Sequence, residues 1–270
     1  MEYSEVLNCV KLVGPLLSPV DLMAMSRLSK KWYKAVRHVY PTFNLQASLR
    51  SIVGSQIDGL LSAGCYIFGS TLVHAMHYIP GTEKPIMNDI DLFYPVPNIY
   101  SLKNGNLAFM MKNEFMKSLI KNHKVIENKG YSIWRDEKKV STFSLEKSGK
   151  KCYDLNFINT YSYGHISERI DSIIRASYYD IQQNYCFIKG DKFVFKSFCP
   201  YSHFTRIATY TVDCEIDIIK LVSYAQIFKK FRFDLTSTKL MTHVAKLRDS
   251  HPCTFTLQDT FITLHLHHTP

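Results

Sequence analysis

In one stretch of the chain the spacing of apolar residues changes twice, and each change predicts a new element. Residues 65–68 form a short apolar run of the kind found in buried strands, and Gly69 and Ser70 follow it as a turn. Residues 71–79 then repeat apolar side chains at helical spacing, and residues 88–96 alternate polar and large apolar side chains. The predicted order is strand, turn, helix and second strand.

The second of these strands carries two aspartates, Asp89 and Asp91, between large apolar residues. Alternate residues of a strand point to opposite faces, so both carboxylates are expected on one face, with Ile90 and Leu92 in the core behind them. Their Cα atoms are then about 7 Å apart, which lets both carboxylates converge on one or two divalent cations. Oxygen ligands of this kind suit Mg²⁺ or Mn²⁺.

A third acid, Asp154, lies in a similar alternating run, KCYDLNFI. If its strand lies beside the strand of Asp89 and Asp91, three carboxylates share one face. Three like charges repel each other unless a cation, lysine or arginine neutralises them. Asp180 is a rival for the third position, although the polar residues after it are more typical of an edge strand. Asp89, Asp91 and Asp154 therefore predict a metal site, and a surface on which salt bridges pair these acids is the alternative.

Similar patterns predict the elements of the rest of the chain. The predicted helices cover residues 44–64, 107–122, 165–177 and 215–231, and the predicted strands cover 131–136, 139–146, 152–160 and a hairpin over 178–198 that turns at Gly190 and Asp191. We therefore expect an α+β fold in which a mixed sheet is flanked by helices.

The first forty residues read as a separate helical segment. Ser18 and Pro19 mark a turn, Asp21 opens the next helix, and apolar residues continue at helical spacing to Val39. The run LLSPVDLMAMSRLSKKWYKAV resembles an F-box, a three-helix motif that docks on a Skp1-type adaptor of ubiquitin ligases. The usual Leu-Pro pair at its start is absent, and a small helical hairpin packed on the main domain is the alternative.

Composition limits the classes of protein and of partner. The chain has 270 residues, 46% hydrophobic and 21% charged, which is enough to bury a sizeable core. Its seven cysteines include no C-x-x-C pair, which favours reduced thiols over a disulfide framework or a zinc site. A formal charge of +10 favours polyanionic partners such as nucleic acid or nucleotide phosphates. We expect no signal peptide and no membrane span.

Together, FGS, NDIDLF and YDLNFI resemble the DNA polymerase β-like nucleotidyltransferase superfamily, and residues 192–212 with the helix that holds Lys220 loosely resemble the helical half of its compact viral and phage members. The resemblance covers roughly residues 63–161 and implies transfer of a nucleoside monophosphate from an NTP to a hydroxyl of RNA, protein or a small molecule. It implies that Gly69 and Ser70 hold the triphosphate. It also implies that Asp89 and Asp91 ligate both metals, while Asp154 ligates the catalytic metal and activates the attacking hydroxyl.

Several basic residues are candidates for contacts with the nucleotide or RNA. Arg206 and Lys220 are predicted nucleotide-binding residues, whereas Lys229 and Lys230 fit a solvated helix face. Histidines are less informative. His74 and His77 fit an amphipathic helix, and His265, His267 and His268 fit a frayed chain end.

The predicted organisation is an F-box-like helical segment over residues 1–41, a nucleotidyltransferase-like core over 42–200 and a helical part over 201–270. The leading hypothesis is a metal-dependent nucleotidyltransferase that uses NTP and acts on RNA, protein or a small molecule. The alternatives are a catalytically inactive ubiquitin-ligase adaptor that binds a Skp1-type protein through residues 1–41, and a nucleic-acid-binding module. The combination resembles what large DNA viruses encode, which implies the cytoplasm of an infected host cell.

Overall fold

A computed structural model describes most of the chain. The described residues are 1–40, 45–79, 81–85, 87, 89–96, 112–127, 141–159, 166–177, 179–210, 218–228, 230–232, 253–258 and 261–266. They form two compact units, and each is described by itself. The first unit contains residues 1–174 and 184–197, and the second contains residues 175–183 and 198–270. The predicted boundaries at residues 41 and 200 remain predictions.

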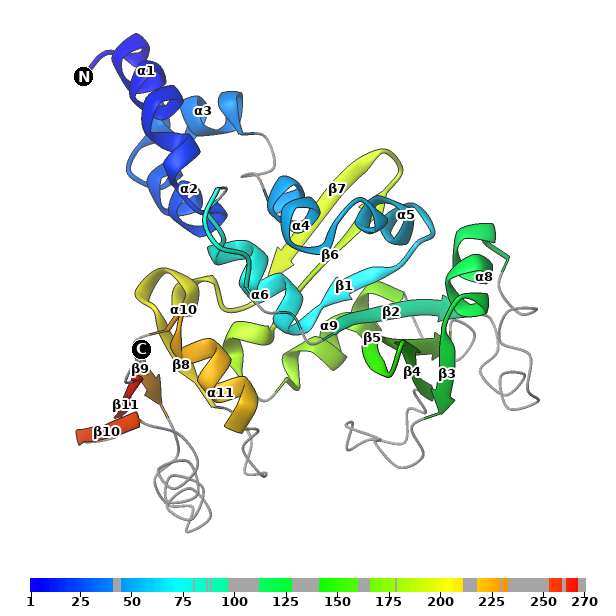
Figure 1. Cartoon of the computed structure of the whole chain (residues 1–270). Helices are drawn as coiled ribbons and strands as arrows, with labels where there is room; N and C mark the ends of the chain where they lie inside the picture. Colours follow the sequence, from blue (N-terminus) through cyan, green and yellow to red (C-terminus); the bar gives the residue numbers. More distant parts are fainter. Residues whose placement is uncertain are drawn as a thin grey trace. The chain divides into compact units, whose positions relative to one another are not determined.

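A seven-stranded mixed sheet is the centre of the first unit (Figure 1). Its strands are β1 (Tyr66–Phe68), β2 (Ile90–Val96), β3 (Lys124–Glu127), β4 (Ser141–Lys147), β5 (Lys150–Asn159), β6 (Asn184–Lys189) and β7 (Lys192–Ser197). The spatial order is β3-β4-β5-β2-β1-β6-β7. Strands β2 and β5 run parallel, and the other neighbouring pairs run antiparallel. The predicted α+β class with a mixed sheet is confirmed.

Helices flank this sheet, as the sequence predicts. They are α4 (Leu45–Val53), α5 (Gln56–Ser62), α6 (Gly69–His77), α8 (Glu114–Lys121) and α9 (Ile166–Arg175). The prediction of one helix over residues 44–64 is wrong, because the chain breaks at Gly54, whose φ of +98° belongs to the left-handed region that glycine tolerates. Helix α6 contacts β1, β2 and β6 and directly follows β1. The turn between β1 and α6 therefore lies at the centre of the sheet.

The N-terminal segment folds as α1 (Tyr3–Val13), the short 3₁₀ turn η1 (Gly14–Leu16), α2 (Pro19–Ser26) and α3 (Lys30–Val39) (Figure 1). The predicted turn at Ser18 and Pro19 precedes α2, and Ser18 caps the helix: its side chain accepts from the Asp21 backbone N–H at 3.3 Å, and the Asp21 carboxylate accepts from the Ser18 hydroxyl at 2.5 Å. Val10, Leu22 and Val36 are fully buried between these helices.

The second unit differs from its prediction, because the described part of residues 201–270 contains a four-stranded sheet. Its strands are β8 (Ile207–Thr209), β9 (Lys230–Arg232), β10 (Cys253–Gln258) and β11 (Phe261–Leu266), in the order β10-β11-β9-β8. Two helices, α10 (Pro200–Thr205) and α11 (Ile218–Ala225), belong to the same part. The period-two alternation of CTFTLQ and FITLHL is the signal that identifies the two C-terminal strands.

Asp180 belongs to this second unit, where its side chain connects η3 to α10 and β8. It lies in the 3₁₀ turn η3 (Asp180–Gln182) rather than in an edge strand. Its buried carboxylate accepts from the Ser202 hydroxyl and, at 2.8 Å, from the Thr209 backbone N–H. Burial raises the pKa of Asp180 despite these hydrogen bonds, which lower it. Asp180 therefore makes structural hydrogen bonds within the second unit.

Some predicted features lie outside the described residues. These are the predicted strand over 131–136, residues 107–111 at the start of the predicted helix over 107–122, and the residues Lys229, His267 and His268. Among the residues that the structure describes, no helix combines the length and apolarity that crossing a membrane requires.

Buried His74 on α6 gives a pH prediction for the first unit. Burial lowers the pKa of His74 from 6.5 to about 4. A histidine whose folded pKa lies below its unfolded value contributes stability above pH 6.5, and this contribution is lost as the pH falls towards 4. We expect the unfolding free energy reported by hydrogen exchange at α6 amides to fall by roughly 2–3 kcal/mol from this group between pH 7 and 4.5. His74→Gln should remove that part of the loss, and an equal loss in both proteins would contradict the assignment.

Candidate metal centre

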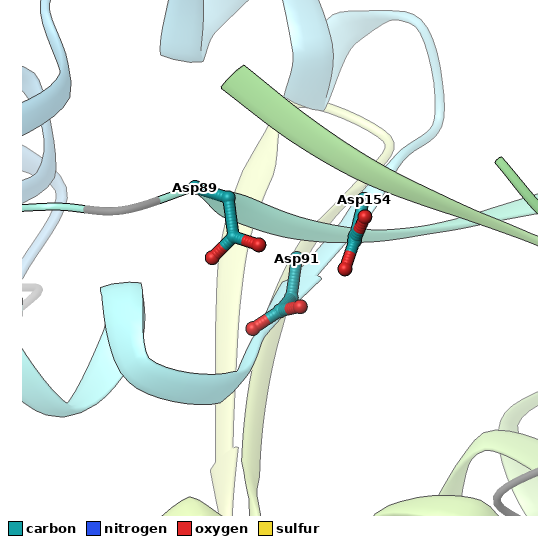
Figure 2. A group of neighbouring side chains, drawn as sticks. All are labelled: Asp89, Asp91 and Asp154. Atoms are coloured by element: carbon teal, nitrogen blue, oxygen red, sulfur yellow. The ribbon is translucent and has the colours of Figure 1, made fainter. Parts of the chain in front are cut away.

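Three carboxylates converge on one face of the seven-stranded sheet (Figure 2). Asp89 directly precedes β2, Asp91 is the second residue of β2, and Asp154 lies on β5. One oxygen from each carboxylate lies within 4.8 Å of the others. All three residues are partly buried, and the side chains of Asp89 and Asp154 are 15% and 18% exposed. The prediction that these three acids lie close together on one face is confirmed.

The pairing of β2 with β5 explains why the third acid joins the first two. The two strands run parallel with Asp91 directly opposite Asp154, and opposite residues of neighbouring strands share a face. Asn156, two residues after Asp154, donates from Nδ2 to the backbone C=O of Leu92 at 3.3 Å. This side chain fixes the register beside the acids. A slip of one residue would move Asp154 to the other face.

The opposite face of the same strands is apolar. Ile90 and Leu92 are 7% and 0% exposed, as the alternation predicts. Ile90 and Tyr153 also line a cavity of about 510 Å³ together with residues of α5 and α8, including Phe115. None of its lining residues is acidic. The acidic face of the sheet is therefore separate from this pocket, whose lining mixes apolar and uncharged polar residues with Lys147.

The turn at Gly69 lies against Asp91. Gly69 has a φ of +71°, and a Cβ atom placed there would lie 2.1 Å from Oδ2 of Asp91. Both the backbone conformation and the contact exclude a larger residue. The predicted strand–turn–helix corner is confirmed: β1 ends at Phe68, and α6 begins at Gly69. Sequence reasoning found this turn but could not place it against a carboxylate.

A hydrogen bond connects the two ends of the long segment between the Gly69 turn and Asp89. Eighteen residues separate Ser70 from Asp89. The Thr71 hydroxyl nevertheless donates to the backbone C=O of Asp89 at 3.2 Å. The first turn of α6 is thereby held beside the beginning of the acidic strand. Residues 69–71 therefore lie against both Asp89 and Asp91.

Lys151 is the residue of this centre that sequence reasoning missed. Its Nζ lies 2.6 Å from Oδ2 of Asp89 and 2.5 Å from Oδ2 of Asp154. The Ser144 hydroxyl, on the neighbouring strand β4, donates to Oδ1 of Asp154 at 2.7 Å. A spacing of three residues would place Lys151 and Asp154 on opposite faces of a regular strand, but the pairing of β4 with β5 shifts register between Leu145 and Glu146, beside Lys151.

The charges of this centre do not balance within these four side chains. Burial by itself lowers the pKa of Lys151, but hydrogen bonds and charges from Asp154 and Asp89 outweigh it, so the net pKa is raised. The amine therefore stays protonated at neutral pH and supplies one positive charge to three carboxylates. The remaining negative charge favours a divalent cation.

The other predicted nucleotide-binding residues belong to the second unit. Arg206 follows α10 and adopts a left-handed backbone conformation, with a φ of +58°. Lys220 lies exposed on α11. Asp180 also lies in that unit, whereas Asp89, Asp91 and Asp154 come together within the first unit. The roles of Arg206 and Lys220 remain predictions.

Comparisons with known proteins add little to this geometry. No family model matches the chain, and no curated protein matches it. One similar solved structure is the apo form I of a CCA-adding enzyme, with a TM-score of 0.39 and 13% identity. The match covers 76% of this chain and 45% of that enzyme, so the chain spans less than half of its length. A TM-score this low does not establish a shared fold, and the functional proposal rests on the site itself.

Replacing Lys151 tests whether its amine and a metal ion compete for the same carboxylates. Without divalent cations, Lys151→Met should lower the unfolding free energy by about 1 kcal/mol, because the pair is partly exposed. Added Mn²⁺ should then stabilise Lys151→Met more than the unchanged protein, because no amine must be displaced. Thermal unfolding with and without MnCl₂ measures both effects.

Lys150→Met is the matched control, since Lys150 is the exposed neighbour on the same strand. It removes the same charge from the chain without touching the carboxylates. An equal stabilisation of all three proteins by Mn²⁺ would contradict competition between the amine and the cation, and no stabilisation of any of them would contradict a cation site among these acids.

Proposed function

We propose that the chain is a divalent-metal-dependent nucleotidyltransferase. It transfers a nucleoside monophosphate from an NTP to a hydroxyl group of RNA, protein or a small molecule. The observation that carries this proposal is the convergence of Asp89, Asp91 and Asp154 within 4.8 Å beside the turn at Gly69. The distances, the burial and the corner between β1 and α6 support it.

The donor set fits Mg²⁺ or Mn²⁺. All its candidate ligand atoms are carboxylate oxygens, the hard donors that these cations prefer. Asp89 and Asp91 would hold both ions of a two-metal site, and Asp154 would hold the ion nearer the acceptor. When bound, the ions neutralise charge on the attacking and leaving oxygens of a phosphoryl transfer.

The protein's own groups then have distinct roles. The Ser70 hydroxyl and the backbone N–H groups at the start of α6 bind phosphate oxygens, aided by the helix dipole. Asp154 takes the proton of the acceptor hydroxyl, whose oxygen forms a bond to the α-phosphorus. The bond from that phosphorus to the bridging oxygen breaks, and pyrophosphate leaves. Arg206 and Lys220, which belong to the second unit, stay predicted nucleotide-binding residues.

Asp89→Asn tests the proposal because it keeps the size of the side chain and removes its charge. We expect transfer of label from α-labelled NTP to fall by at least about a hundredfold, the order seen when one electrostatic group of an active site is lost. The assay uses the four NTPs with Mg²⁺ or Mn²⁺ against RNA and protein acceptors.

Asp58→Asn is the control, because Asp58 is a partly exposed acid of the same unit, paired with Arg50 on α4. It should retain activity. Unchanged transfer in Asp89→Asn would show that Asp89 has no part in the reaction.

A second candidate function has support from the surface of residues 1–40. Large apolar side chains that are exposed among the described residues lie, apart from Tyr201, in this helical segment: Met1, Tyr3, Leu12, Leu16, Leu28 and Tyr33. Leu28 was expected in the apolar stripe but is 68% exposed. Exposed apolar side chains gathered in one segment favour a protein partner. An inactive adaptor that docks on a Skp1-type protein through residues 1–41 is therefore the alternative.

Leu16→Asp with Leu28→Asp tests this alternative. Both side chains are about two-thirds exposed, so the fold should persist while binding is lost by at least tenfold, since burying two unpaired carboxylates is costly. Size-exclusion chromatography with a Skp1-type protein measures binding, and Tyr201→Asp is the control outside the segment.

The two functions separate in the same experiment. Co-elution without NTP turnover supports the adaptor, and turnover without co-elution supports the enzyme. Binding that survives the double substitution would show that this surface is not the docking site.

A further inference from the structure

The acidic face of the sheet continues into a row of aromatic side chains. Strand pairing places Asp154 opposite Asp91, Asp91 opposite Phe68, Phe68 opposite Tyr185, and Tyr185 opposite Lys196. Opposite residues share a face. The row therefore crosses five neighbouring strands, β5-β2-β1-β6-β7, with acids at one end and rings next to them.

Aromatic side chains of this face of the sheet contact one another. The rings of Phe68 and Phe93 stack with centroids 3.9 Å apart and an interplanar angle of 7°. The rings of Tyr66 and Phe187 stack with centroids 4.7 Å apart. Tyr185 lies 6.0 Å from Tyr66. Two pairs of stacked rings thus occupy the face beside the carboxylates.

Burial shows which rings present a surface. Phe93 is 0% exposed and Tyr185 is 1% exposed, so both are covered. Phe68, Tyr66 and Phe187 are partly exposed. Within the Phe68–Phe93 stack, Phe68 is therefore the partly exposed residue.

The far end of the row is closed by α9. The Tyr185 hydroxyl donates to Oδ1 of Asp171 on α9 at 2.6 Å, and the Lys196 amine pairs with the other oxygen of that carboxylate. This ion pair leaves the partly exposed rings between two polar ends.

We propose that Phe68, supported by Phe93, is the stacking surface for the base of the nucleotide whose phosphates bind at the metal centre. This inference rests on the proposed function. Phe68 is one strand away from Asp91, about 5 Å across the sheet, which is the kind of separation that a sugar spans between a phosphate and its base. Phe68 also directly precedes Gly69, so one corner of the chain holds both ends of the nucleotide.

The chemistry of the surface sets the class of ligand. Aromatic rings stack on any nucleobase, because every base has a π-face, and stacking is worth about 1–3 kcal/mol per base. Phe68 offers no hydrogen-bonding group, so it binds a base without selecting one. ATP is therefore a suitable probe of the subsite.

Calorimetric titration with ATP and with inorganic tripolyphosphate, both with Mg²⁺, separates the base from the phosphates. We expect Phe68→Leu to weaken ATP binding roughly tenfold and to leave tripolyphosphate binding unchanged. Phe68→Tyr, which keeps the ring, should bind ATP like the unchanged protein. Phe143→Leu is the matched control, since Phe143 is a buried ring on the opposite face of the same sheet.

Each other outcome has a definite meaning. If Phe68→Leu weakens both ligands or neither, Phe68 is a packing residue and the inference is overturned while the metal centre stands. If Phe68→Leu weakens binding of a short oligoribonucleotide but not of ATP, the ring serves the acceptor strand, and the assignment to the nucleotide is overturned. If the unchanged protein binds neither ATP nor tripolyphosphate, the proposed function fails, and the inference fails with it.

Discussion

Electrostatic repulsion among Asp89, Asp91 and Asp154 is the constraint around which the first unit is built. Oxygens of the three carboxylates lie within 4.8 Å of one another, and two unit charges at that upper limit repel each other by about 3.5 kcal/mol at an effective dielectric constant of about 20. Folding must supply the free energy that holds three of them together. The parallel pairing of β2 with β5 does so, and Lys151 offsets part of the repulsion. A protein that keeps such a cluster at the centre of its sheet keeps it at a cost in stability, which is typical of functional sites.

The neighbouring elements are arranged around this cluster rather than around the apolar core alone. Gly69 allows the backbone to approach Asp91 more closely than any other residue would, and Thr71 fastens α6 to the backbone of Asp89. The face then passes from acids to the ring of Phe68 one strand away. The three carboxylates, the corner at Gly69 and the ring of Phe68 therefore lie beside one another on the sheet, and the proposed function assigns them to the metal ions, the phosphates and the base of one nucleotide.

Much of this centre follows from local sequence patterns. The alternation around Asp89 and Asp91 predicts their shared face, and the change from an apolar run to Gly69 and Ser70 predicts the corner. The same patterns could not predict Lys151, because its long side chain reaches the acids only when β5 lies beside β2.

Non-local contacts also explain the errors. The four-stranded sheet of the second unit pairs β8 with β9, about twenty residues later in the chain, and β9 with the distant β11. The apolar run over residues 215–231 reads as a single helix, yet α11 is followed by strand β9, because pairing with β8 and β11 stabilises an extended backbone there. Leu28 has the spacing of a core residue, but the helix break between α2 and α3 turns it outward.

A crystal structure of the protein grown with Mn²⁺ tests the central claim most directly, because manganese is located by its anomalous scattering. The account predicts an anomalous peak among the carboxylates of Asp89, Asp91 and Asp154, with the Lys151 amine moved away from them. A structure that shows no peak there, with Lys151 still bridging Asp89 and Asp154, would contradict it.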